Sequence, residues 1–125
     1  MNPMFQKLVV VLITIALLPA LAGCAGSQPD SVEITQGTVL LDVRDQSEYQ
    51  SGHLEDARLL SLNSGELSAA LPDLDPDAQY VIYCRSGNRS AQAAALMKRA
   101  GFTDVTDLGS MSNAASATGL ATVTQ

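Results

Sequence analysis

The residues of this 125-residue chain that could carry out chemistry lie in the run Tyr83-Cys84-Arg85-Ser86-Gly87-Asn88-Arg89-Ser90. An apolar segment, 80–83, leads directly into the cysteine, and an alanine-rich segment that favours a helix follows it. A helix N-terminus and nearby cations lower the pKa of a thiol and favour the reactive thiolate. Cys84 is therefore the candidate nucleophile, placed between a strand and a helix.

The loop after Cys84 has the composition of an anion-binding ring. Backbone amides between Arg85 and Ser90 can turn inward around the sulfur, and Gly87 permits the positive φ that such a ring usually needs. Arg85 and Arg89 add positive charge, which lowers the thiol pKa and attracts anions. The alternative is a plain strand-to-helix connection with an incidental cysteine. A chain with only 7 lysines and arginines disfavours that alternative.

The other cysteine, Cys24, closes an apolar N-terminal segment. Lys7 precedes a long apolar run over 8–21, and the small residues Ala22 and Gly23 lead into Cys24. A positive flank, an apolar core and a small-residue cleavage site are typical of an export signal. The Leu-Ala-Gly-Cys ending resembles the lipobox of bacterial lipoproteins. That resemblance implies a signal peptide over 1–23 and a lipidated Cys24.

An uncleaved membrane anchor is the alternative for this segment. Extended to Gly26, the apolar stretch approaches the ~18–20 residues that cross a bilayer, although Pro19 suits a signal better than a spanning helix. Both interpretations place the rest of the chain outside the cytoplasm. If the source has two membranes, Ala25 and Gly26 after the lipobox resemble the signal for the outer membrane facing the periplasm.

The mature chain would be one small acidic domain. Cleavage before Cys24 leaves 102 residues (125 less 23), a lipid-anchored linker over 24–31 and a domain over 32–125. Without Lys7, six basic residues face thirteen acidic ones, a net charge of −7. Such a domain lacks the basic footprint of a nucleic-acid-binding protein. With Cys24 lipidated, Cys84 is the remaining thiol, and an unpaired thiol in an oxidising compartment indicates a use.

Apolar runs that alternate with helix-favouring segments predict a small α/β domain. We expect buried strands over 39–43 and 80–83, shorter strands over 57–62 and 105–108, and an edge strand over 32–35. Helices are expected over 45–50, 65–71 and 90–100. This order favours a largely parallel sheet, in which ligands bind beyond the carboxyl ends of the strands. Cys84 stands at such an end.

Three segments, in this order, resemble a single-domain rhodanese. They are Leu41-Asp42-Val43-Arg44 with Glu48-Tyr49, Gly52-His53-Leu54 and Ala57; Tyr80 through Ala91; and Leu96 with Ala100-Gly101-Phe102 and Val105. The resemblance runs from about 39 to 123 and covers most of the mature chain. It implies a three-layer domain with a largely parallel central sheet and helices on both faces.

The resemblance implies sulfane-sulfur transfer. The Cys84 thiolate would take sulfur from an anionic donor such as thiosulfate, and a thiol or cyanide would remove it from the persulfide. The loop residues Arg85, Ser86, Gly87, Asn88, Arg89 and Ser90 would bind the substrate, with the two arginines recognising the donor. Neither a metal nor an organic cofactor is implied, and a monomer is expected. The alternative is a non-catalytic module that carries persulfide or senses oxidants.

Loop length and the remaining polar residues refine this expectation. Cell-cycle phosphatases and some arsenate reductases of this architecture place the arginine six positions after the cysteine. Here Arg89 is five positions after Cys84, which predicts a ring sized for one sulfur. Arg44 is expected to pair with Asp45 or Glu48.

Three further features bear on the surroundings of the loop. The single histidine, His53, is expected to be a turn or packing residue, because a metal site would need more ligands. Glu55 and Asp56 are expected to form a solvated loop where the family usually has Pro-Gly. The chain has no tryptophan, which predicts lighter packing in its C-terminal segment.

Overall fold

The structure, a computed structural model, describes residues 30–124. The elements follow one another as β1 (Thr38–Asp42), α1 (Gln46–Ser51), β2 (His53–Leu54), β3 (Arg58–Leu59), α2 (Glu66–Ala70), the 3-10 helix η1 (Leu71–Asp73), β4 (Gln79–Cys84), α3 (Asn88–Arg99), β5 (Asp104–Ser110), α4 (Met111–Thr118) and β6 (Thr122–Val123). The predicted signal peptide, Cys24 and most of the predicted linker lie outside the described residues. Within residues 30–124, no helix has the length and apolarity to cross a membrane.

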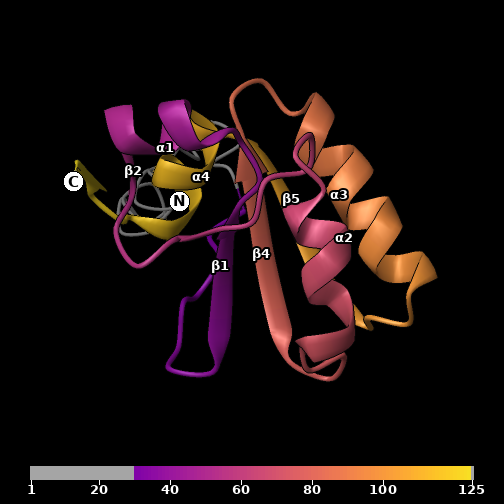
Figure 1. The fold of residues 1–125 in the computed structure, drawn as a ribbon. Helices are drawn as coiled ribbons and strands as arrows, with labels where there is room; N and C mark the ends of the chain where they lie inside the picture. The colour runs from indigo at the N-terminus through magenta and orange to yellow at the C-terminus, as the bar shows by residue number, and fades with distance from the viewer. Residues whose placement is uncertain (1–29, 125) are drawn as a thin grey trace, which may run out of the picture.

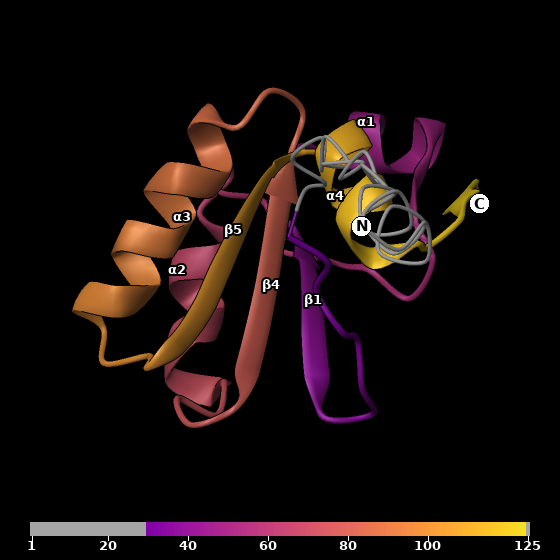
Figure 2. The same cartoon turned by 180° about the vertical axis from the view of Figure 1, so that it is seen from behind.

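The central sheet is parallel and is covered on both faces. Its strand order is β3-β1-β4-β5, and every neighbouring pair is parallel. Helices α2 and α3 lie on one face, whereas α1 and α4 lie on the other (Figures 1 and 2). The predicted α/β three-layer architecture is therefore confirmed. A second, two-stranded sheet pairs β2 with β6 in antiparallel fashion.

Strand β4 is buried on both sides and divides the core in two. Tyr80, Ile82 and Cys84 point into the cluster beneath α2 and α3, which includes Met97 and Phe102. The alternate residues, Val81 and Tyr83, join the cluster beneath α4. A strand buried on both faces reads as one continuous apolar run because neither set of alternate side chains meets water. This burial places Cys84 at the end of the most enclosed strand.

The predicted elements agree with the structure where the sequence pattern is long. The expected strands 39–43 and 80–83 correspond to β1 and β4, and the helix expected from residue 90 begins two residues earlier, at Asn88. The expected edge strand over 32–35 is wrong, because this segment packs against α4. The Val32 amide donates to the Ala117 carbonyl in the last turn of α4 at 2.9 Å, and the Thr35 amide donates to the Thr38 hydroxyl at 3.0 Å, so neither amide pairs with the backbone of a strand. The strand expected over 57–62 is reduced to Arg58–Leu59.

Candidate active site

Cys84 ends β4 at the carboxyl edge of the sheet, where the ladder to β5 is irregular. Its register partner is Ser110, and the register shifts between Ile82 and Cys84. The side chain points toward the α3 face and is fully buried, with 0% exposure. Of the residues that the structure describes, Cys84 is the one free cysteine. The sequence therefore places a thiol where a parallel sheet opens toward its ligand side.

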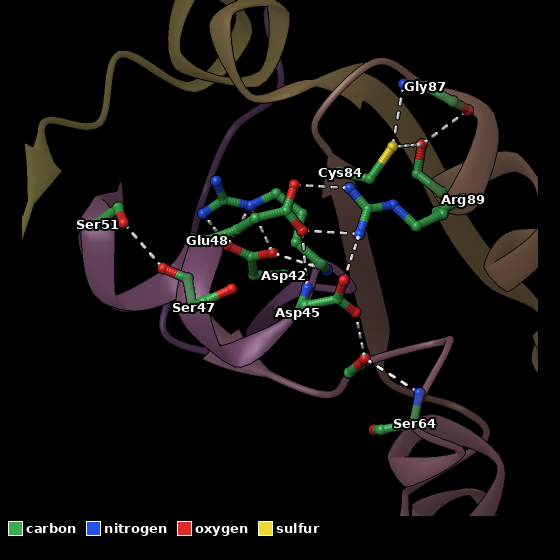
Figure 3. Close-up of polar contacts among 12 residues, drawn as sticks. Asp42, Asp45, Ser47, Glu48, Ser51, Ser64, Cys84, Gly87 and Arg89 are labelled. Carbon is green, nitrogen blue, oxygen red and sulfur yellow. Dashed lines mark hydrogen bonds and ion pairs between the residues drawn. The ribbon is translucent and has the colours of Figure 1, made fainter.

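The chain turns sharply around this sulfur before α3 begins. Gly87 has φ +102°, a left-handed conformation that favours glycine, and it forms the N-cap of α3. Its amide donates to Cys84 Sγ at 3.0 Å (Figure 3). A Cβ on Gly87 would meet Gly109 Cα at 3.6 Å, an ordinary contact. The requirement for glycine at 87 is therefore set by the backbone angle and not by lack of space.

Ser90 closes the ring on the far side of the sulfur. Its Oγ lies 3.4 Å from Cys84 Sγ and is fully buried in the first turn of α3. The same hydroxyl also reaches the carbonyl oxygens of Gly87 at 3.1 Å and Gly109 at 3.4 Å. Because a hydroxyl has one proton, it can donate to only one of these partners at a time. When the thiol ionises, the proton can turn to the sulfur.

These contacts favour the thiolate. Burial by itself raises the pKa of the Cys84 thiol, because a charge is costly away from water. The Ser90 hydroxyl and the backbone amides of Ser90, Gly87 and Ser86 outweigh this effect and bring the pKa below its ordinary value. Of the loop residues predicted to hold the sulfur, Ser86, Gly87 and Ser90 thus direct donors at it. Arg85 and Asn88 are exposed.

Arg89 is held by carboxylates of α1. Its two terminal nitrogens donate to Glu48 at 2.7 and 2.9 Å, and Asp45 lies 3.6 Å away (Figure 3). This forked pair with Arg89 lowers the pKa of Glu48 to about 2, against burial, with help from the Asp45 amide. Glu48 is itself fixed, because it accepts from the Asp45 amide at 3.0 Å, as in a capping box. The arginine expected to meet the donor is therefore neutralised by its neighbours.

The predicted partners of Arg44 are wrong. Arg44 pairs with Asp42 at 2.6 Å, and its guanidinium also donates to the Gly52 carbonyl at 2.7 Å. Both side chains of this ion pair are buried, and the guanidinium lies 5.7 Å from the ring centre of Tyr83. The two residues face the same way from the end of β1, since they are two apart along an extended chain. Asp45 and Glu48 were the predicted partners because they are close to Arg44 in sequence. In the structure both carboxylates pair with Arg89 instead.

His53 packs as expected, and Glu55 and Asp56 are exposed. The His53 ring stacks on Tyr49 at 3.7 Å between centroids and makes a 2.8 Å hydrogen bond from Nδ1 to the Tyr49 carbonyl. Among residues 30–124, no group of three or more His, Cys, Asp or Glu side chains is placed to hold a metal ion.

The C-terminal segment contributes more to the site than the sequence pattern suggested. Gly109 and Ser110, at the end of β5, border the loop, and the Ser110 hydroxyl caps α4 by accepting from the Asn113 amide at 3.1 Å. The sequence analysis predicted lighter packing here because the chain has no tryptophan. In the structure the buried face of α4 consists of the small residues Ala114 and Ala117. A serine followed by an alanine-rich run was the available signal for this helix.

An open pocket of about 490 Å³ lies beside the loop. It is lined by Arg44, Glu48, Ser51, Arg85, Met111 and Ser112. Cys84 is not part of this lining, but Arg85, which follows it, is. The pocket therefore adjoins the loop that carries the candidate nucleophile, and residues of α1, the loop and the start of α4 contribute to its walls.

Comparison with known proteins identifies the class. The Rhodanese-like domain family matches residues 30–116, and the chain belongs to that family. Over 72 residues it is 44% identical to the probable adenylyltransferase/sulfurtransferase MoeZ of Mycobacterium tuberculosis, covering 55% of this chain and 18% of the relative. Over 70 residues it is 39% identical to the thiosulfate sulfurtransferase GlpE of Pseudomonas savastanoi, covering 56% and 64%. The aligned region is thus under two thirds of each relative's length.

Solved structures agree with this assignment. The rhodanese-like domain of an Anabaena sp. protein superposes with a TM-score of 0.61 at 28% identity, covering 72% of this chain and 90% of that one. A rhodanese with anions from E. coli superposes with a TM-score of 0.58 at 24% identity, covering 70% and 99%. The second likeness concerns the fold alone.

Proposed function

We propose that this protein is a sulfurtransferase that carries sulfane sulfur as a persulfide on Cys84. The observation that carries the proposal is the convergence of an amide at 3.0 Å and a hydroxyl at 3.4 Å on one buried sulfur. The fixed dipole of the Gly87 amide stabilises a negative sulfur without reorganisation during the reaction, and the Ser90 hydroxyl can turn its proton to the sulfur. They also hold the pKa of the thiol below its ordinary value.

The reaction proceeds in two balanced steps. The Cys84 thiolate attacks the outer sulfur of thiosulfate, a new S–S bond forms, and the S–S bond of the donor breaks, so that sulfite leaves with the electron pair. In the second step a thiolate or cyanide attacks the outer sulfur of the persulfide. The electron pair of the broken bond then returns to Cys84 Sγ. A covalent intermediate of this type gives ping-pong kinetics.

The relatives and the loop support this chemistry over phosphoryl transfer. Both curated relatives carry sulfurtransferase in their names, and one of them is named for thiosulfate. Arg89 follows Cys84 by five positions, and its guanidinium is engaged by Glu48. Because Arg89 is held by Glu48, the groups that contact the sulfur are the Gly87 amide and the Ser90 hydroxyl.

Mass spectrometry of the intact protein tests the proposal. After exposure to thiosulfate, polysulfide or another sulfane donor, the wild-type protein should gain the mass of one sulfur atom at Cys84. Cys84→Ser should gain none and should be inactive with thiosulfate and cyanide. Arg58→Gln, an exposed change on β3, serves as the matched control and should behave as wild type.

Two results would count against the enzyme. If no sulfane donor loads Cys84, sulfur transfer is refuted. If the persulfide forms but neither cyanide nor any thiol removes it, the protein is instead a non-catalytic persulfide carrier or oxidant sensor.

We further propose that the domain is lipid-anchored through Cys24 and lies outside the cytoplasm. The support is the Leu-Ala-Gly-Cys sequence after an apolar run, with a short polar linker leading to the domain. Metabolic labelling with a radioactive fatty acid should mark the wild-type protein and leave Cys24→Ala unmarked. Labelling that is equal in the two proteins, or absent from both, would refute lipidation at this position.

A further inference from the structure

The pocket beside the loop has an uneven supply of charge. Two charged residues of the lining, Arg44 and Glu48, are already neutralised. Arg44 pairs with Asp42 at 2.6 Å, and Glu48 binds Arg89 through both carboxylate oxygens. Arg85 is exposed and makes no ion pair or side-chain hydrogen bond within residues 30–124. Its guanidinium is therefore the charge that remains available in the pocket.

The other walls of the pocket are apolar or carry hydroxyl groups that are already hydrogen-bonded. The Ser51 hydroxyl donates to the Ser47 carbonyl at 2.9 Å (Figure 3), and the Ser112 hydroxyl lies 3.1 Å from that of Ser110. Met111, half-buried at the start of α4, adds a flexible apolar surface. A ligand seated here would contact methionine along its body and one cation at its end.

The size of the pocket points to an organic ligand. A volume of about 490 Å³ falls within the range of sites for small organic molecules. An arginine that is not paired elsewhere recognises a carboxylate through two parallel hydrogen bonds. Since Arg85 directly follows Cys84, a carboxylate held there would keep the rest of its molecule close to the nucleophile.

We infer that this pocket selects the sulfur acceptor, a low-molecular-weight organic thiol with a carboxylate that Arg85 binds. The inference rests on the proposed persulfide chemistry. The acceptor thiolate attacks the outer sulfur of the Cys84 persulfide, forming an organic persulfide. The S–S bond to Cys84 breaks, and its electron pair stays on Cys84 Sγ as thiolate. Arg85 is thus a specificity-determining residue, whereas Arg89 holds the loop against α1.

Three thiols of similar size test the inference: mercaptopropionate, mercaptoethanol and cysteamine, which carry a carboxylate, a hydroxyl and an ammonium group. The protein is loaded with polysulfide, desalted and mixed with each thiol at equal thiolate concentration. Loss of the persulfide is then followed by mass spectrometry in a single turnover. We expect mercaptopropionate to react about fivefold faster than mercaptoethanol, as for one exposed ion pair, and cysteamine to react slowest.

Arg85→Gln should bring the three rates within about twofold of one another, while Arg58→Gln keeps the wild-type order. Raising the ionic strength should reduce the advantage of mercaptopropionate in the wild-type protein, a readout that does not depend on any variant. Equal rates in wild type, or an unchanged order in Arg85→Gln, would overturn the inference. If Cys84 takes up no sulfur at all, the proposed function fails and this inference fails with it.

Discussion

Replacing Glu48 with glutamine tests how the active-site loop is held to the rest of the domain. The pair between Glu48 and Arg89 joins α1 to the first turn of α3, which are 41 residues apart in sequence. Glutamine keeps the size and one hydrogen-bond acceptor but removes the negative charge. The change therefore isolates the ionic part of the contact.

The magnitude follows from the pKa of Glu48. The Arg89 hydrogen bonds lower it from 4.5 to about 2, which corresponds to about 3 kcal/mol of interaction with the charged carboxylate. The two side chains retain 21% and 20% exposure, so water screens part of this energy. Glutamine also keeps some of the hydrogen bonding. We expect the variant to lose about 2 kcal/mol of unfolding free energy at neutral pH, between typical surface and buried pairs.

The pH dependence gives the sharper measurement. A carboxylate whose pKa is lowered in the folded state stabilises fully above its unfolded pKa of 4.5, and the stabilisation disappears as the pH falls through about 2. Urea unfolding of both proteins should show a constant difference from neutral pH down to about pH 5 and a shrinking one below it. Near pH 2 the two curves should approach each other.

Glu55→Gln provides the control, since Glu55 is exposed and its side chain makes no hydrogen bond within residues 30–124. It should change the unfolding free energy by less than about 0.5 kcal/mol at every pH. The reasoning would be refuted if Glu48→Gln cost no more than this control. A difference that persisted unchanged to pH 2 would also refute it, because the effect would then not depend on the carboxylate charge.

Three further substitutions probe the surroundings of the sulfur and the ion pair between Asp42 and Arg44. Gly87→Ala should cost about 1–2 kcal/mol in urea unfolding because alanine resists the positive φ, and no loss would mean that the turn adapts. Ser90→Ala should raise the pKa of Cys84, because the sulfur loses the hydroxyl that lowers it, and the iodoacetamide alkylation profile should shift to higher pH. An unshifted profile would contradict this and show that the backbone amides alone lower the pKa of Cys84. Asp42→Asn should cost about 3–5 kcal/mol by leaving Arg44 buried without its counter-charge, and a loss near zero would contradict that.

The strands and the loop could be predicted because their signals are local. The apolar run before Cys84 is long enough to identify a buried strand, and Gly87 marks the left-handed turn within three residues of it. The shortest elements had no comparable signal. Strands β2, β3 and β6 have two residues each, which is too few for a periodic pattern. Their pairing depends on the packing around them.

The ion pairs show where local reasoning is insufficient. Arg44 was expected to pair with Asp45 or Glu48, its neighbours in sequence, yet it turns inward to Asp42. Glu48 instead meets Arg89, because β1 and β4 are adjacent in the sheet and bring the N-terminal ends of α1 and α3 together. Arg89, which the sequence analysis expected to recognise the donor, therefore also joins α3 to α1 through Glu48. Arg85 is the loop arginine that makes no ion pair within residues 30–124.

By itself, the sequence determined the class of fold and pointed to the candidate nucleophile: Cys84 at the end of an apolar run, a five-residue step to Arg89, and the alternation of strands and helices. These features can be read from the chain in order, since each strand, helix and turn is marked by residues within it. Only the tertiary structure decided which carboxylates neutralise Arg89, how Gly109 and Ser90 close around the sulfur, and which cation faces the pocket. Those outcomes depend on packing between segments up to 41 residues apart, which no local pattern records.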